Sequence, residues 1–410
     1  MKKLIVCIIL CSCFTSIGSA QICQVETDFE KVNGVVIHKS TNKPANGIVA
    51  YSCDDGRTVE IPYKNGIKEG MAKSYYKDGK LYSETPFRNG KIEGIEKVYN
   101  GYGGIGMEIP YKNGILEGTE KRYRGGKLEA EFPYKNGKFD GVKKHYYENG
   151  NLSSEAPFKN GELDGMLKSY FTDGTLSVET PYKNGKAEGV EKTYFEDGKL
   201  CTETTYQNGK EEGIKNHYAR NGKMWMETSY KNGKRDGRER SYNYDGWLFV
   251  ENYFKDDILE GSYKIYHENG NLRSEVLYKA GKKEGIEKEY YKSGGLEKEI
   301  SYKAGKKEGI TKEYYANGKL EAETSYRNGV IEGIKTMYDE NGRLQYEVPY
   351  KNDEIDGTAK KYAADGRLRV KVLFKNGKPV SAVCGNGRKL TSKEFTNLIK
   401  TDMEDDPCGR

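Results

Sequence analysis

From residue 62 onward the chain alternates short stretches containing apolar side chains with polar turn signals at a constant spacing. A typical unit, Pro62 to Thr85, contains Asn65-Gly66 and Asp78-Gly79, which separate stretches of about eight to ten residues. Asn-Gly and Asp-Gly are the preferred central pairs of type I′ turns, whose positive φ angles suit two-residue β-hairpins. Each unit is therefore predicted to form two antiparallel strands.

The unit recurs with a period of 24 residues, shortened once to 23. A diverged unit precedes the array, where Gly47 and Gly56 keep the spacing of Gly70 and Gly79, and a partial unit begins at Leu373. A period maintained over more than 300 residues identifies a repeat architecture. The thirteen full units start at Pro62, Pro86, Pro110, Pro133, Pro157, Pro181, Thr205, Ser229, Tyr253, Leu277, Ser301, Ser325 and Pro349.

Charged side chains predict the register of the hairpins. With a two-residue turn at Asp78-Gly79, Lys73 faces Glu84, Glu69 faces Arg88 and Gly70 faces Phe87. Opposite charges across a ladder are favourable, and a slip of one residue would lose every pair. We expect the ring opposite each strand glycine to cover its bare backbone, as in aromatic rescue.

The predicted fold class is all-β: tandem antiparallel β-hairpin repeats forming an elongated, twisted, largely single-layer sheet, with a short C-terminal helix as cap. Thr391 and Glu394 have the spacing of a capping box, and Phe395, Leu398, Ile399 and Met403 would line one face of that helix. The expected division is a signal peptide at 1–20, an N-terminal cap with the diverged repeat at 21–61, the thirteen repeats at 62–372, and the partial repeat with the helical cap at 373–410.

The N-terminus has the pattern of an export signal. Lys2 and Lys3 precede an apolar run from Leu4 to Leu10, and Gly18 and Ala20 suit cleavage before Gln21. The alternative is a lipobox that ends at Cys13, which would anchor the protein to a membrane as a lipoprotein. Either pattern predicts an exported protein of the periplasm, the cell surface or the medium.

Five cysteines follow the predicted cleavage point. In an exporting compartment they are disulfide candidates, because no Cys-x-x-Cys pair suggests a zinc site. Pairing Cys23 with Cys53 and Cys384 with Cys408 would staple the two ends and leave Cys201 single. The alternative is that all five are free thiols.

Composition argues against several classes of function. The 68 basic residues nearly balance the 62 acidic ones, whereas a nucleic-acid-binding protein carries a concentrated basic patch. The four histidines lie in different units, and none shares a recurring site with a Ser or Cys. We therefore expect no enzyme, no catalytic or metal site, and no cofactor.

Binding to another protein is the remaining expectation. Exposed aromatic side chains are good anchors because they bury a large area at little entropic cost. The alternative is that these rings only cover neighbouring leucines. The candidate aromatic stripe consists of Tyr76, Tyr147, Phe171, Phe195, Tyr291 and Tyr315.

The repeat resembles a known family. Tyr-Lys-Asn-Gly-Lys-x-Glu-Gly at 182–189, followed by Tyr-x-x-Asp-Gly-Lys-Leu at 194–200, is similar to the MORN repeat variant, which occurs in bacterial tandem-repeat proteins including YwqK-type antitoxins. The resemblance covers about residues 38–377. It implies β-hairpin rods that act as scaffolds, dimerisation units or contacts to phospholipid head groups, and its YwqK-type branch implies neutralisation of a toxin by direct binding.

Three functions therefore remain open from the sequence. The first is an exported, non-catalytic scaffold that binds a protein partner, and the second is an antitoxin or immunity protein whose partner is a toxin. The third is a structural or adhesive rod of the cell envelope, or a phospholipid-binding module. Interleaved charges do not favour contact with membrane lipid, and self-association stays open.

Overall fold

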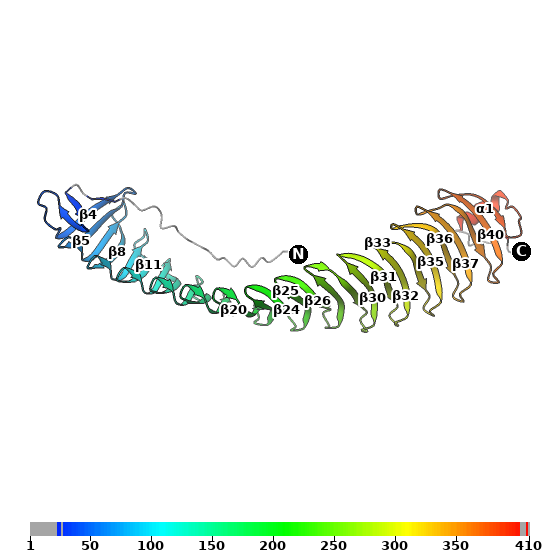
Figure 1. Cartoon of the computed structure of the whole chain (residues 1–410), viewed down its shortest axis with the longest axis horizontal. Coiled ribbons are helices and arrows are strands. Elements are labelled where there is room, and N and C mark those ends of the chain that lie inside the picture. Colours follow the sequence, from blue (N-terminus) through cyan, green and yellow to red (C-terminus); the bar gives the residue numbers. More distant parts are fainter. Residues whose placement is uncertain (1–22, 26–27, 402–406, 409–410) are drawn as a thin grey trace. The chain divides into compact units, whose positions relative to one another are not determined.

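The computed structural model describes residues 23–25, 28–401 and 407–408. The chain divides into two compact units, Met1–Glu188 with Glu196–Gly198 and Gly189–Phe195 with Lys199–Arg410. The predicted signal peptide, Cys13 and Met403 lie outside the described residues. In each unit, antiparallel strands follow one another as hairpins in an open sheet, so the predicted all-β fold is confirmed (Figure 1).

The strands of the first unit are β1 (Cys23–Val25), β2 (Phe29–Val32), β3 (Val35–His38), β4 (Gly47–Cys53), β5 (Thr58–Lys64), β6 (Ile67–Lys68), β7 (Gly70–Tyr75), β8 (Leu81–Arg88), β9 (Lys91–Ile92), β10 (Gly94–Tyr99), β11 (Ile105–Lys112), β12 (Ile115–Leu116), β13 (Gly118–Arg124), β14 (Lys127–Lys135), β15 (Lys138–Phe139), β16 (Gly141–Tyr146), β17 (Leu152–Lys159), β18 (Glu162–Leu163), β19 (Gly165–Tyr170), β20 (Leu176–Lys183) and β21 (Lys186–Ala187).

The elements of the second unit are β22 (Gly189–Tyr194), β23 (Leu200–Gln207), β24 (Lys210–Tyr218), β25 (Met224–Lys231), β26 (Lys234–Tyr242), β27 (Leu248–Lys255), β28 (Ile258–Leu259), β29 (Gly261–Tyr266), β30 (Leu272–Lys279), β31 (Lys282–Tyr290), β32 (Leu296–Lys303), β33 (Lys306–Lys307), β34 (Gly309–Tyr314), β35 (Leu320–Arg327), β36 (Val330–Tyr338), β37 (Leu344–Lys351), β38 (Glu354–Ile355), β39 (Gly357–Tyr362), β40 (Leu368–Lys375), β41 (Lys378–Cys384) and helix α1 (Ser392–Lys400).

The two turns of each repeat differ in type. At Asn65-Gly66 both residues have positive φ, 53° and 75°, and Lys64 pairs with Ile67, which is the predicted type I′ turn. At Asp78-Gly79 only the glycine has positive φ, and the Tyr76 amide donates to Lys80 O while the Gly79 amide donates to Tyr76 O. The prediction of a two-residue turn there is wrong, because this is a three-residue loop with the glycine in the left-handed conformation.

The predicted register holds along the regular part of the hairpin. Lys73 faces Glu84 and Gly70 faces Phe87, but a bulge between Ser74 and Tyr75 shifts the pairing so that Tyr75 faces Leu81. The loop has three residues instead of two, so the two strands contribute unequal numbers of residues next to it. A bulge accommodates the one-residue difference and shifts the pairing.

The predicted pair of Glu69 with Arg88 is absent. Glu69 lies between β6 and β7, where its amide donates to Pro62 O, and Gly70 after it has a φ of 107°. A Cβ on Gly70 would stand 3.2 Å from Pro62 Cγ. The positive φ and the close approach of Pro62 therefore require a glycine at this position. Phe87 lies opposite this glycine in the ladder, as predicted.

The alternation of side chains gives the sheet two faces. We call one the ring face, which carries Phe87, Thr85 and Ala72 in the typical hairpin, and the other the ion-pair face, which carries Pro86, Glu84, Met71 and Lys73. Most buried side chains of the array, including Ala72, Phe132, Thr204, Val276 and Ile300, belong to the ring face.

Terminal segments cover the ring face at the first and last repeats. Val36 from the separate β2–β3 hairpin packs with Ala45, Val49, Ile61 and Tyr63 in one buried cluster. At the other end, the wholly buried Leu398 of α1 packs against Ala359, Val370, Val372 and Phe374. The helix begins with the predicted capping box of Thr391 and Glu394. The described caps thus bury the ring face of the first and last repeats and pack on neither end of the ion-pair face.

Candidate interaction surface

The six side chains of the candidate aromatic stripe are all half-buried. The hydroxyls of Tyr147, Tyr291 and Tyr315 donate hydrogen bonds of 2.6 to 2.7 Å to the backbone carbonyls of Tyr170, Tyr314 and Tyr338 in the next repeat. Tyr76 makes the same bond to Tyr99 O at 3.0 Å. These hydroxyls therefore tie successive repeats together.

The two phenylalanines of the stripe occupy the same position without a hydroxyl. Phe195 lies under the guanidinium of Arg220, 4.9 Å from the ring centroid. Phe171 closes its turn through backbone bonds with Thr175 and Gly174. The stripe consequently lies between repeats, and its members are only partly accessible to a partner.

A second row of tyrosines is bonded to glutamates on the ion-pair face. Tyr146 and Tyr170 donate to Glu131 and Glu155 at 2.8 and 2.7 Å. Burial, followed by this hydrogen bond, raises the pKa of each phenol to about 12. The same contact is made by Tyr75, Tyr99, Tyr123, Tyr218, Tyr290, Tyr314 and Tyr362.

The acidic residue before each strand glycine binds the turn of the following repeat. Glu69 accepts a hydrogen bond of 2.8 Å from the amide of Asn89, the first residue of the next Asn-Gly turn. Asp140 makes the equivalent contact with Asn160, and this contact takes the place of the pair predicted for Glu69 across the ladder. A charge-assisted bond of this kind holds adjacent turns in contact.

Exposed aliphatic side chains recur directly after the strand glycine. They lie on the ion-pair face, each opposite a proline, threonine or serine, and are 39 to 54% exposed. Sequence reasoning missed this row, although its signal is the recurrence of Met, Ile or Val after the glycine. We call it the aliphatic row; its members are Met71, Ile95, Val142 and Met166 in the first unit and Val190, Ile214, Ile286, Ile310 and Ile334 in the second.

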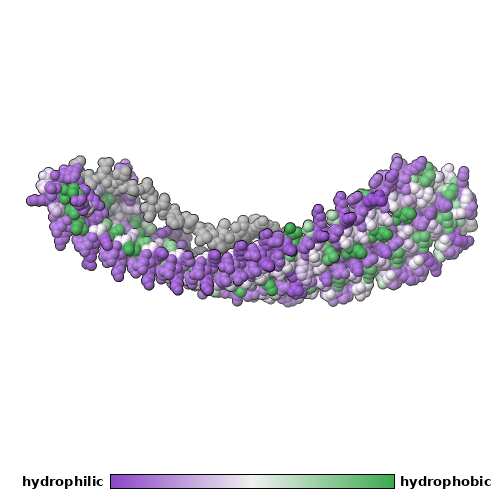
Figure 2. Space-filling view, in the orientation of Figure 1, coloured by the Kyte–Doolittle hydropathy of each residue, from purple (hydrophilic) through white to green (hydrophobic). Residues whose placement is uncertain are grey.

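Charges beside the aliphatic row alternate in sign. Lys73 and Glu84 lie 3.5 Å apart, and Lys312 and Glu323 lie 3.7 Å apart. Exposed pairs of this kind contribute at most about 1 kcal/mol each. Their alternation gives this face charges of both signs close together. In Figure 2 the visible surface is largely hydrophilic, with separate hydrophobic patches between the polar side chains.

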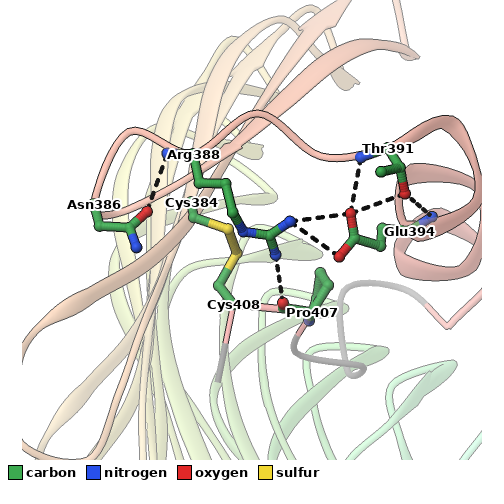
Figure 3. The surroundings of a disulfide bond; sticks show 7 residues. All are labelled: Cys384, Asn386, Arg388, Thr391, Glu394, Pro407 and Cys408. Carbon is green, nitrogen blue, oxygen red and sulfur yellow. Dashed lines mark hydrogen bonds and ion pairs between the residues drawn. A yellow bond between two sulfur atoms is a disulfide. The ribbon is translucent and has the colours of Figure 1, made fainter. Parts of the chain in front are cut away.

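Four of the five cysteines lie near the ends of the array. Cys384 and Cys408 form a disulfide, beside which Arg388 donates to Glu394 and to Pro407 O (Figure 3). Cys53 is disulfide-bonded, and Cys23 occupies the ladder position opposite it. Cys201, half-buried within β23, is a free thiol.

The histidines lie apart from one another. Burial, followed by the nearby positive charges of Lys143 and Lys215, lowers the pKa of His145 and His217 below the usual value. Within the described ranges no group of three or more His, Cys, Asp or Glu side chains is arranged to hold a metal ion. The described helix is also too short to cross a bilayer.

The sequence model of the MORN repeat variant matches nine segments, at residues 68–89, 139–160, 163–184, 187–208, 211–232, 259–280, 283–304, 307–328 and 331–352. No curated protein matches the chain.

Similar solved structures include a TcdB2-TccC3-Cdc42 complex, with 11% identity over 87% of this chain and 22% of that chain, at a TM-score of 0.16. Another is the Tc holotoxin pore of Photorhabdus luminescens, with 11% identity, 90% and 26% coverage, and a TM-score of 0.16. The chain thus spans about a quarter of their length. TM-scores this low do not identify a common fold.

Proposed function

Because the chain belongs to the MORN repeat variant family, we propose that it is a non-catalytic scaffold that binds another protein through its aliphatic row. The observation that carries this proposal is the recurrence of exposed Met, Ile and Val at one position of the repeat, on the face that both terminal caps leave bare. Exposed apolar side chains that recur on one face and are rimmed by polar residues are typical of protein interaction sites.

The surroundings of the aliphatic row favour a protein as its occupant. The adjoining Lys–Glu pairs, such as Lys73 with Glu84, give this face charges of both signs in close alternation. An anionic membrane is attracted by a surplus of basic residues, whereas mixed charges around an apolar centre match the composition of protein interfaces. Lipid contact is therefore the weaker alternative.

We also propose that the protein acts outside the cytoplasm, in the periplasm, at the cell surface or in the medium. Support comes from the Cys384–Cys408 disulfide and from the disulfide-bonded state of Cys53. Disulfides persist in oxidising compartments and are rare in the cytosol. The expected export signal and the alternative lipid anchor at Cys13 are consistent with this location.

The binding proposal is tested in two steps. The chain, tagged after Ala20, is crosslinked in its own cells, and the captured protein is purified. Its affinity is then measured for the unchanged chain, for Ile286→Ser/Ile310→Ser/Ile334→Ser in the row, and for Ile67→Ser/Ile115→Ser/Ile258→Ser, a matched control. The control isoleucines are 44 to 51% exposed but lie at the turns.

The row variant should bind at least about tenfold more weakly, since truncating interface anchors costs more than 1 kcal/mol each, while the control keeps its affinity. Both variants should keep the circular dichroism of the unchanged chain. Equal affinity of the two variants would overturn the proposal. Capture of a toxin as the stoichiometric partner would assign neutralisation, and recovery of the chain alone would favour a structural rod.

A further inference from the structure

Basic side chains face each other across the ladder at many of the type I′ turns. These residues immediately flank the turn, and all are exposed. The register pairs are Arg88 with Lys91, Lys135 with Lys138, Lys183 with Lys186, Lys231 with Lys234, Lys279 with Lys282, Lys303 with Lys306, and Lys375 with Lys378.

This arrangement is unfavourable for folding. Like charges directly opposite one another in an antiparallel pair repel, with Cβ atoms only about 5 Å apart. Elsewhere on the same strands lysine faces glutamate, as Lys288 of β31 faces Glu299 of β32. Lysines are therefore concentrated at the turn edge, whereas the ion-pair face carries both signs of charge. The small net charge of the whole chain does not reveal this local excess.

Two adjacent turns of the second unit concentrate this feature. Their sequence is Lys-Ala-Gly-Lys-Lys at 279–283 and again at 303–307. Ala280 and Ala304 replace the usual asparagine and have φ of 48° and 49°. Alanine in the left-handed conformation costs about 1 kcal/mol, whereas asparagine adopts it more readily. Both turns thus combine local strain with the repulsion of their lysines. We call them the twin lysine turns.

The twin lysine turns are in direct contact. The Gly305 amide donates to Lys283 O at 2.8 Å, and the Ala304 amide donates to Glu284 Oε2 at 2.7 Å. A Cβ on Gly305 would lie 3.6 Å from Lys282 Cβ. Hydrogen-bonded backbone therefore fixes the spacing of the two lysine pairs, at about 10 Å for a separation of two strands.

Nearby acidic groups do not neutralise the four lysines at the turn positions. Glu284 and Glu308 accept hydrogen bonds from backbone amides, and Glu287 pairs with Lys283 at 2.6 Å. Lys307 lies 4.9 Å over the ring of Tyr326. Within the described ranges, no carboxylate lies within 4.0 Å of Lys279, Lys282, Lys303 or Lys306 Nζ.

We propose that the twin lysine turns bind a linear polymer that carries phosphate groups. Lysine ammonium groups bind phosphate oxygens as point charges, and a bound anion would relieve the repulsion within each pair. A small anion can contact one pair, whereas an extended polymer reaches both and gains from the second contact through its high effective concentration. This site lies at the turn edge, apart from the aliphatic row.

The test uses inorganic polyphosphate as the probe and pyrophosphate as its short counterpart. Affinities are measured at several salt concentrations for the unchanged chain and for Lys279→Gln/Lys282→Gln/Lys303→Gln/Lys306→Gln. The matched control is Lys135→Gln/Lys138→Gln/Lys183→Gln/Lys186→Gln, which removes the same charge from two pairs separated by another repeat, with Asn-Gly in both turns.

Polyphosphate should bind far more tightly than pyrophosphate, with an affinity that falls as salt rises. The twin-turn variant should lose at least about tenfold in affinity and reduce the salt dependence, as expected when phosphate contacts are removed, while the control changes little. Equal losses in both variants, or equal affinity for pyrophosphate, would overturn the proposal. Tighter binding to phosphatidylglycerol vesicles, affected equally by both variants, would also overturn it and identify a membrane surface.

Discussion

The phenol of Tyr170 donates a 2.7 Å hydrogen bond to Glu155 Oε1, a residue fifteen positions earlier on the neighbouring strand β17. Glu155 also lies 3.6 Å from Lys168, so one carboxylate serves both a hydroxyl and an ammonium group. Because the repeat reproduces this contact, one short motif sets the ionisation of a whole row of tyrosines.

The tyrosine row predicts a loss of stability at alkaline pH. Burial, followed by the glutamate bond, raises the pKa of Tyr146, Tyr170, Tyr290 and Tyr314 to about 12 from the usual value of about 10. The folded state holds the phenolic protons more tightly, so this stabilisation is complete below pH 10 and decreases as pH rises toward 12. Absorbance titration should show later phenol ionisation in the folded chain than in denaturant. Coincident curves would contradict the prediction.

A side chain added at a strand glycine should destabilise the sheet more than one added at a loop glycine. The strand glycine combines a positive φ with a close contact, whereas the loop glycine has the positive φ alone. Gly165 has a φ of 125°, and a Cβ there would stand 2.7 Å from Pro157 Cγ. Gly150 has a φ of 89° and open space around it. Gly165→Ala should therefore lower the free energy of unfolding by at least about 1 kcal/mol more than Gly150→Ala. Denaturant unfolding measures both, and equal losses would show that the bulge adapts.

Replacing the alanines of the twin lysine turns should stabilise the chain. Ala280→Asn and Ala304→Asn restore the residue that favours positive φ at this position of a type I′ turn. Each should raise the free energy of local opening by about 0.5 to 1 kcal/mol. Hydrogen exchange of the Gly281 and Gly305 amides, which donate to Leu259 O and Lys283 O, reports the change. Asn328→Ala is the converse control and should increase exchange at Gly329.

Removing the C-terminal disulfide should loosen the helical cap. Cys384 and Cys408 are 24 residues apart, and closing a loop of that size stabilises by about 3 kcal/mol in the chain-entropy account. Cys384→Ser/Cys408→Ser should therefore increase hydrogen exchange and proteolysis in α1, while the array keeps its protection because repeats depend on their neighbours. Cys201→Ser is the control, since that thiol is free. Unchanged protection of α1 would contradict the prediction.

The sequence by itself determined the local backbone and the pairing of strands. Asn65-Gly66 specifies a type I′ turn through the φ preferences of two adjacent residues, and Lys73 with Glu84 fixes the register through charge. Asp78-Gly79 was ambiguous because the same dipeptide also fits a three-residue loop with only its glycine in the left-handed region.

Only the tertiary structure decided which side chains form contacts between stacked repeats and which remain exposed. Glu69 accepts from the amide of Asn89, and Tyr147 donates to Tyr170 O, because successive turns and loops stack on one another. The dihedral preferences of single residues do not predict contacts between residues 20 or more positions apart. Ile286 stays 52% exposed on the ion-pair face, whereas Ile300 on the ring face is buried. The lysine pairs at 279/282 and 303/306 form one patch because the two turns stack, with the Gly305 amide donating to Lys283 O. Local dihedral preferences act over neighbouring residues, whereas burial and charge clustering depend on contacts between repeats.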